Sequence, residues 1–269
     1  MDVPAKTLQK YSDFLYETTG ILYGKPKQSV LRGKLARLLA RKNLESADDF
    51  LKHILSPGHA HDCQDFIDAM TTNTTEFFRE PDHFEYIEAQ LPSIMARNPR
   101  IERSRTIRVW SAACSTGQEP VTIAMVLSRQ LPKDIQIRIL ATDVSTQALV
   151  KAIRGHYSES DVQGIPQKQL KRHFTPYEGG HQVSEEIRAL ITYRQFNLQS
   201  EFRFKHGFDL IFCRNVMIYF DYNIQQALTD KFYNQLVPGG LLFVGHAESL
   251  FNKSHRFHSI GHSIYLKEY

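Results

Sequence analysis

The chain is poor in the residues that would crosslink it covalently or anchor it in a lipid bilayer. Its 269 residues include three cysteines, Cys63, Cys114 and Cys213, which are too few and too scattered for a disulfide framework. No stretch approaches the roughly 18–20 uninterrupted apolar residues that span a bilayer. The N-terminal residues also lack the apolar core of a signal peptide. These absences predict a cytoplasmic protein that does not insert into a membrane.

The net charge is small, but basic residues are concentrated in one segment. The net charge of +4 does not by itself indicate nucleic-acid binding. Residues 25–42, however, carry basic side chains and no acidic ones. A helix over 29–41 would project three of the basic residues from a face opposite its apolar residues, which are Val30, Leu31, Leu35, Leu38 and Leu39. The three are Lys34, Arg37 and Arg41. Such a face favours an anionic partner, although a merely solvated helix face has the same pattern.

The first third of the chain has no strand pattern. Apolar residues recur at helical spacing over 7–18, 29–41, 47–55, 62–70 and 81–90. Residues 92–105 then contain two prolines and several arginines, a composition that is typical of a linker. We therefore predict an all-helical N-terminal domain over 1–91, a linker over 92–105 and a second domain over 106–269.

The second domain alternates short apolar runs with helical segments. Strands are expected over 107–110, 135–141, 190–196, 208–212 and 241–245, and helices over 120–131, 146–154 and 223–236. This alternation predicts an α/β fold with a doubly wound, mostly parallel, Rossmann-like sheet. Residues 258–269 suit a closing antiparallel strand at the sheet edge. Residues 171–183 predict a hairpin around Glu178-Gly179-Gly180, so a small antiparallel β-insertion is expected at about 171–187.

The loop after the first predicted strand contains a single glycine. Residues 111–120 read SAACSTGQEP, and small residues let the backbone turn sharply and approach a ligand. The loop has neither G-x-G-x-x-G nor G-x-x-x-x-G-K-[ST], so no dinucleotide or phosphate cradle is indicated. Asp143 ends the next strand, where a carboxylate can accept hydrogen bonds from ribose hydroxyls. Glu119 would repel a phosphate and attract a sulfonium or ammonium group. Residues 108–143 are therefore predicted to bind S-adenosyl-L-methionine.

Three separated motifs resemble the chemotaxis receptor methyltransferases, the CheR family. They are NTTEFFRE at 73–80, ACSTGQEP at 113–120 and FCRNVMIYF at 212–220. The resemblance implies a helical domain packed on a methyltransferase domain with a small β-subdomain. It also implies transfer of the cofactor methyl group to glutamate side chains of chemoreceptor cytoplasmic helices, which forms methyl esters and S-adenosyl-L-homocysteine during sensory adaptation. The cofactor pocket that it implies is lined by Asn73, Thr75, Arg79, Glu119, Asp143, Asn197, Leu198, Arg214 and Asn215.

The implied reaction makes few chemical demands on the protein. A glutamate carboxylate is already ionised at neutral pH, so methyl transfer requires alignment and exclusion of water more than a strong base. We predict that Arg79 pairs with the cofactor carboxylate and that Tyr219 orients the target carboxylate. Packing beside Phe220 is the alternative for Tyr219. The basic side chains Lys34, Arg37 and Arg41 would dock the acidic receptor surface.

The remaining predictions concern the β-insertion, metal binding and partners. The insertion tip after Phe174 is shorter than in family members that bind a C-terminal receptor peptide by strand pairing, so direct binding of the receptor bundle is expected. His59, His61 and Cys63 have metal-like spacing but no fourth ligand, so no metal is predicted. We expect a monomer whose partner is the chemoreceptor cytoplasmic domain, not nucleic acid. A methyltransferase for another substrate and a non-catalytic, cofactor-binding docking module are the alternatives.

Overall fold

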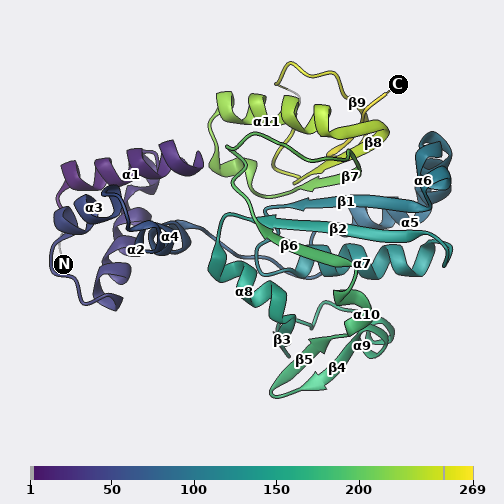
Figure 1. The fold of residues 1–269 in the computed structure, drawn as a ribbon, viewed down its shortest axis with the longest axis horizontal. Helices are drawn as coiled ribbons and strands as arrows, with labels where there is room; N and C mark the ends of the chain where they lie inside the picture. The colour runs from purple at the N-terminus through teal and green to yellow at the C-terminus, as the bar shows by residue number, and fades with distance from the viewer. Residues whose placement is uncertain (1–2, 251, 269) are drawn as a thin grey trace.

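The computed structural model describes residues 3–250 and 252–268. Figure 1 shows a helical domain and an α/β domain, joined by a single stretch of chain between α4 and α5. Gly20, at φ +78°, ends the first helix in the left-handed conformation, as its position predicts. The helices of the N-terminal domain are α1 (Ala5–Thr19), α2 (Gln28–Arg41), α3 (Ala47–Leu55) and α4 (Ala60–Met70), with a short 3-10 helix, η1 (Lys25–Lys27).

The helical domain has its own apolar core, which includes residues of all four α-helices. Leu31, Leu35, Leu38 and Leu39 of α2 are buried in it. The prediction is wrong for Val30, whose side chain is 50% exposed. Val30 precedes Leu31 by one residue, a rotation of about 100° around the helix, and this turns it away from the partners of Leu31.

The α/β domain is built on a seven-stranded sheet with the order β6-β2-β1-β7-β8-β10-β9. Its first five strands run parallel, β10 runs antiparallel to them, and β9 pairs antiparallel with β10 at the sheet edge. This confirms the predicted doubly wound, mostly parallel sheet. The strands are β1 (Thr106–Ala112), β2 (Gln136–Asp143), β6 (Ile191–Gln195), β7 (Phe208–Cys213), β8 (Leu236–Val244), β9 (His258–Gly261) and β10 (Ile264–Leu266).

The predicted single closing strand over 258–269 is two strands. Ser263, at φ +60°, lies in the turn between β9 and β10, so the chain reverses there and pairs with itself. The last predicted residue, Tyr269, lies outside the described residues. Among the described helices, none has the length and apolar character needed to cross a bilayer.

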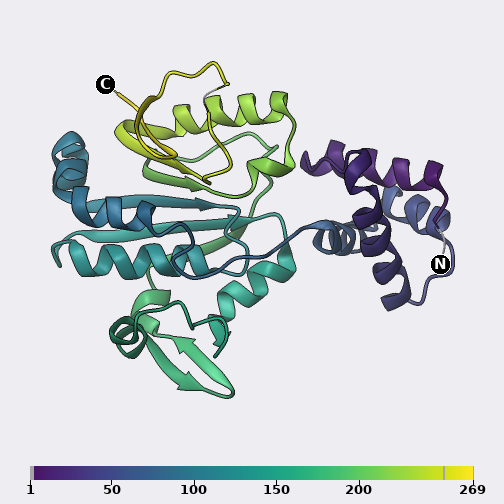
Figure 2. The same ribbon diagram turned by 180° about the vertical axis from the view of Figure 1, so that it is seen from behind.

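Both faces of the sheet are covered by helices. Along β1, Val109 packs into the core shared with α5, α6 and α7, and the next residue, Trp110, packs into the core shared with α11 on the other face. This alternation follows from the two-residue period of a strand. Figures 1 and 2 show the two layers from opposite sides. The helices are α5 (Asp82–Arg97), α6 (Pro99–Ser104), α7 (Gln118–Gln130), α8 (Thr146–Arg154) and α11 (Tyr222–Gln235).

The segment predicted as a linker over 92–105 is helical, so the predicted boundary there is wrong. Pro92 lies inside α5, and Pro99 is the first residue of α6, where proline needs no backbone N–H partner. Helix α5 buries Phe84, Ile87 and Leu91 against the sheet, so it belongs to the α/β domain. The connection between the domains is therefore the non-helical chain between Met70 and Asp82.

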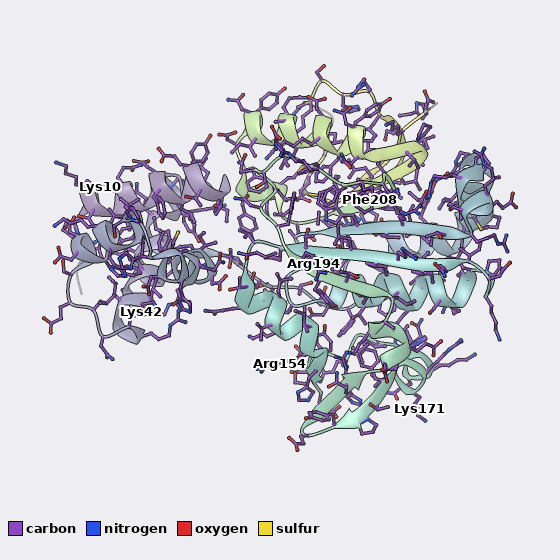
Figure 3. All side chains as sticks on the ribbon, in the orientation of Figure 1. Lys10, Lys42, Arg154, Lys171, Arg194 and Phe208 are labelled. Atoms are coloured by element: carbon purple, nitrogen blue, oxygen red, sulfur yellow. The ribbon has the colours of Figure 1, made fainter. Side chains whose placement is uncertain are left out.

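The predicted hairpin in the β-insertion is present, but the insertion begins earlier than expected. A short strand after α8 pairs with the hairpin to give a second sheet with the order β3-β5-β4. Figure 3 shows two basic side chains near this insertion, Arg154 at the end of α8 and Lys171 on α9. The elements are β3 (His156–Ser158), α9 (Gln167–His173), β4 (Phe174–Tyr177), β5 (Gly180–Val183) and α10 (Glu185–Arg188).

Candidate active site

A cavity of about 360 Å³ lies at the carboxyl ends of β1, β2, β6 and β7. This is the place where the strand order reverses, at which doubly wound sheets bind ligands. The helical domain covers it with the chain after α1 and the chain after α4. The volume is within the range of about 300–1,000 Å³ that is common for small-molecule sites. Its lining includes Tyr219 and all the residues predicted for the cofactor pocket: Asn73, Thr75, Arg79, Glu119, Asp143, Asn197, Leu198, Arg214 and Asn215.

The two domains are joined by hydrogen bonds around this cavity. Asp68 of α4 accepts hydrogen bonds from the backbone N–H of Thr146 at 2.9 Å and from its hydroxyl at 2.7 Å. The helical domain thereby caps the positive N-terminal end of α8. Further bonds run from Ser115 Oγ to Asn73 O at 2.8 Å, from Asn197 Nδ2 to Thr18 O at 2.6 Å, and from Leu22 N to Tyr219 O at 2.9 Å.

Asp143, at the end of β2, fixes the cofactor loop and faces the cavity. Its Oδ2 atom accepts a hydrogen bond from Ser115 N, and its Oδ1 atom accepts one from Ser145 N, both at 2.8 Å. Burial raises the pKa of this carboxyl group, and the backbone hydrogen bonds oppose that rise. Each carboxylate oxygen has a second lone pair, so Asp143 can still accept hydrogen bonds from ribose hydroxyls.

Glu119 occupies the first turn of α7. Its Oε1 atom accepts a hydrogen bond from Ser111 Oγ at 2.7 Å, and its Oε2 atom is 3.2 Å from Arg214 Nη1. Burial raises the pKa of the carboxyl group, although the nearby guanidinium of Arg214 lowers it. The prediction placed Pro120 first in this helix, but α7 begins at Gln118, so Pro120 is its third residue. It still lies in the first turn, where backbone N–H groups have no partner within the helix.

Arg214, directly after β7, is the centre of a buried ion network. Its side chain is 2% exposed. The guanidinium donates to Glu80 Oε2 at 2.9 Å and to Glu119 Oε2 at 3.2 Å, and also to the backbone carbonyl of Arg79. Burial works to raise the pKa of Glu80, but the hydrogen bond from Asn215 and the charge of Arg214 outweigh it and lower the pKa to about 2. The network joins the 73–80 motif to the sheet.

Glu248, which sequence reasoning missed, supports the loop after β7. Its carboxylate accepts backbone hydrogen bonds from Asn215 at 2.6 Å, Gly245 at 2.7 Å and Ile218 at 3.2 Å. A Cβ atom on Gly245 would lie 2.6 Å from both Asn215 Nδ2 and Glu248 Oε2, so only glycine fits there. Glu248 is a lone acidic residue in the sequence, far from the loop that it holds, so no spacing signal marks it. Glu80 is part of a quoted motif and could have been chosen from it.

Left-handed backbone conformations gather at this site. Such conformations cost on the order of 1–3 kcal/mol for a residue with a side chain and cluster at ligand sites. Four non-glycine residues that line the cavity have positive φ, and Glu80 beside them is a fifth. The four are Phe78, Ala113, Ser115 and Asn215.

Gly117, the single glycine of the cofactor loop, packs against α8 and not against the cavity. Its φ of +95° requires glycine, but a Cβ atom there would lie 2.9 Å from Ala152 Cβ and 2.9 Å from Tyr157 Oη. These neighbours belong to α8 and β3, and Gly117 is not among the residues that line the cavity. The glycine therefore permits close packing of the loop on α8 and not close approach of a ligand.

Arg79 and Tyr219 lie at the cavity, and within the described part of the chain Arg79 has no ion pair with a carboxylate. Arg79 Nη1 donates to the carbonyl of Thr74 at 3.2 Å. The half-buried ring of Tyr219 lies 5.5 Å from the ammonium nitrogen of Lys27. Both side chains belong to the cavity lining, so they are placed to meet a ligand or a substrate.

The three basic residues of α2 that were predicted to dock the receptor, Lys34, Arg37 and Arg41, lie outside the cavity lining. The structure contradicts the outward projection predicted for Lys34. Its ammonium group donates to Met70 O at 2.9 Å and Thr71 O at 2.7 Å, where it binds the carbonyls at the C-terminal end of α4. Arg37 and Arg41 are exposed.

The residues present fit S-adenosylmethionine. Two largely buried carboxylates, Asp143 and Glu119 (13% exposed), face a cavity that also contains the guanidinium of Arg79. The acidic pair suits a ligand with cationic and hydroxyl groups and no phosphate. The guanidinium suits a ligand carboxylate. S-adenosylmethionine has all of these groups, and when bound it supplies an electrophilic methyl group.

Comparisons with known proteins agree with this chemistry. Residues 6–71 match the CheR methyltransferase all-alpha domain, and residues 73–266 match the CheR methyltransferase SAM binding domain. The protein is therefore an S-adenosylmethionine-dependent methyltransferase. The division between residues 71 and 73 also agrees with the boundary in the structure and not with the predicted one.

Close relatives define the family further. A chemotaxis protein methyltransferase of Klebsiella aerogenes is 36% identical over 263 residues, covering 96% of this chain and 88% of the relative. Chemotaxis protein methyltransferase 2 of Pseudomonas aeruginosa is 37% identical, covering 96% and 91%. The chemotaxis protein methyltransferase of Escherichia coli is 35% identical, covering 96% and 89%. The chain belongs to the CheR methyltransferase family.

Proposed function

We propose that this protein transfers the methyl group of S-adenosylmethionine to glutamate side-chain carboxylates on the cytoplasmic helices of chemoreceptors. The products are glutamate methyl esters and S-adenosylhomocysteine. The observation that carries the proposal is the cavity that gathers Glu119, Asp143 and Tyr219 of the α/β domain with Arg79 of the chain between the domains. Relatives named chemotaxis protein methyltransferases support the chemoreceptor as the substrate.

In this proposal the cofactor is held from three sides. Glu119 and Asp143 bind its cationic and ribose ends, and Arg79 pairs with its carboxylate. Asn73 and Thr75 close the pocket from the chain that joins the two domains, and further contacts come from Asn197, Leu198, Arg214 and Asn215. Arg214 also keeps Glu119 in place through the 3.2 Å contact. The protein thus contributes orientation and exclusion of water.

Tyr219 is proposed to orient the target carboxylate. It stands beside the loop that Glu248 holds through the backbone N–H of Asn215 and Ile218. A phenol can donate one hydrogen bond to a carboxylate and does not need to remove a proton, because the target glutamate is ionised at neutral pH. Tyr219→Phe should therefore lower kcat and leave S-adenosylmethionine binding unchanged.

Arg37 and Arg41 are proposed to dock the acidic receptor surface from α2. Both are exposed, and complementary charge raises the association rate and fixes orientation. The double variant Arg37→Glu/Arg41→Glu should weaken receptor methylation without changing cofactor binding. Equal methylation by the double variant and the parent would exclude this docking face. We further propose that the protein acts in the cytoplasm as a monomer.

The function is tested with S-adenosylmethionine labelled in its methyl group. The protein is incubated with chemoreceptor cytoplasmic fragments, and with fragments in which the acceptor glutamates are replaced by glutamine. Base-labile label should appear on the first substrate and be absent from the second. Base-stable label, or label on added tRNA, would contradict the proposal and favour a different methyltransferase activity. Cofactor binding without any transfer would favour the non-catalytic module.

A further inference from the structure

A cluster of histidine and acidic side chains lies beside the site and has no role in the methyl transfer proposed above. Asp82 and His83 begin α5, His246 follows β8, and His262 lies in the turn between β9 and β10. One ligand atom each of Asp82, His246 and His262 lies within 4.8 Å of the others. The His246 Nε2 atom is 3.0 Å from Asp82 Oδ1, and the rings of His246 and His262 have centroids 4.5 Å apart.

A buried nitrogen next to this cluster lacks a hydrogen-bond partner. The side chain of His83 is fully buried, and its Nδ1 atom has no hydrogen-bond partner among the described residues, with Glu80 Oε2 at 3.8 Å. Its other nitrogen, Nε2, lies 3.3 Å from the backbone carbonyl of His262. Ligand atoms of Glu80, His83 and His246 also lie within 4.8 Å of one another. Buried polar atoms without partners are uncommon in proteins because each costs about 1–3 kcal/mol, so this nitrogen is a second sign of a ligand.

The chemistry of the cluster suits a transition-metal ion. Neutral imidazole nitrogens with a carboxylate bind zinc and similar ions. Ligand atoms about 2.0–2.2 Å from a tetrahedral zinc ion lie about 3.3–3.6 Å from one another. The 3.0 Å separation of Asp82 and His246 therefore needs to widen by only a few tenths of an ångström. Asp82, His246 and His262 are partly or fully exposed, so these side chains can move and the site is open to solvent.

Two other groupings are less suitable. Glu80 already binds the guanidinium of Arg214, so recruitment of Glu80 by an ion would break a buried pair. In the helical domain, His59 lies with His53 and Asp62, and not with His61 and Cys63 as the sequence spacing suggested. There the ammonium group of Lys42, labelled in Figure 3, lies 2.7 Å from Asp62, and its positive charge opposes a cation.

We propose that Asp82, His246 and His262 form a binding site for a divalent transition-metal ion of the zinc type, with His83 offering a further nitrogen next to His246. The ligands come from three chain segments that the fold brings together. The site does not depend on the proposed function. It adjoins the pocket wall, because the backbone N–H of His246 donates to Glu80 Oε1 at 3.2 Å.

The test is a titration of the full chain with Zn²⁺ in competition with a chromophoric chelator. His262→Ala and Asp82→Asn should each weaken zinc binding by roughly tenfold to a hundredfold or more, since the loss of a ligand costs at least as much as the loss of a supporting residue. His206→Ala, an exposed histidine elsewhere on the chain, should leave binding unchanged, as should His59→Ala. Thermal unfolding without metal checks that each variant is folded.

A second measurement follows the histidine ring resonances during the titration. Resonances of His246 and His262 should shift first if the cluster binds the ion. Equal zinc affinity in the parent, His262→Ala and Asp82→Asn would overturn the proposal. So would a loss of binding that occurs only in His59→Ala, because that result would assign the ion to the helical domain.

Discussion

Replacement of Arg214 by leucine should be among the most destabilising single changes at the site. The guanidinium is 2% exposed and contacts Glu80 and Glu119, whose side chains are each 13% exposed. Leucine fills part of the space but leaves two buried carboxylates without a cation. Removal of one partner from a buried ion pair costs about 3–5 kcal/mol, and we expect a loss of that size in the free energy of unfolding.

The chain offers a matched control for this experiment. Arg203 and Glu201 form an ion pair at 2.6 Å, but their side chains are 85% and 74% exposed. Arg203→Leu should therefore cost only about 0–1 kcal/mol. Urea unfolding followed by circular dichroism gives both values, provided that the dependence on urea concentration is the same in the variants. The two pairs have similar chemistry and differ in burial.

The reasoning fails if Arg214→Leu costs no more than Arg203→Leu. A double-mutant cycle adds a further check on the network. Arg214→Leu should cost less in a Glu80→Gln background than in the parent, because one of the stranded charges is then absent. Equal costs in both backgrounds would show that Arg214 and Glu80 do not stabilise one another.

Three further predictions concern the loop, the network and the cofactor. Gly117→Ala should lower the free energy of unfolding by about 2–4 kcal/mol, because φ is +95° and the new Cβ would crowd Ala152. At Gly33 a Cβ atom would have nothing within 4 Å, so Gly33→Ala should raise the free energy of unfolding by about 0.5–1 kcal/mol. The pKa of Glu80 is lowered from 4.5 to about 2, so the ionised carboxylate stabilises the fold fully above pH 4.5 and loses this effect as the pH falls towards 2. The difference in unfolding free energy between the parent and Glu80→Gln should therefore shrink over this range by on the order of 3 kcal/mol. Burial raises the pKa of Glu119, so on acidification its charge is lost at a higher pH than that of an ordinary glutamate. Affinity for S-adenosylmethionine should therefore fall more steeply with falling pH than affinity for S-adenosylhomocysteine, and Glu119→Gln should remove that difference; parallel profiles in the parent would contradict this role.

Elements with strong local signals could be predicted from the sequence. The predicted bounds of α3 and α8 agree with the structure. Each helix follows a serine whose hydroxyl accepts a backbone hydrogen bond within the first turn, Ser46 from Asp49 N and Ser145 from Ala148 N, both at 3.2 Å. These capping interactions involve residues close in sequence, so their pattern is visible without the fold.

Features that depend on distant contacts could not be predicted in this way. The three residues of β3 form a strand only because β5 pairs with them, and α5 extends through Pro92 because the sheet covers its apolar face. Lys34 has the sequence context of a surface residue, but its ammonium group donates hydrogen bonds to the backbone carbonyls at the C-terminal end of α4. Most of the pocket residues lie in the three quoted motifs, and Asp143 was found from its place at the end of a strand, whereas Glu248 acts on a loop about thirty residues away and belongs to none of the quoted motifs.

The central claim is tested most directly by identifying the atom that receives the methyl group. Chemoreceptor cytoplasmic fragments treated with the protein and S-adenosylmethionine are digested, and the modified residues are located by mass spectrometry. We predict the mass of one added methyl group on glutamate side chains, its loss after mild base, and its absence with Tyr219→Phe under conditions that limit turnover. A methyl group on lysine, on another nitrogen or on no receptor residue would contradict the account.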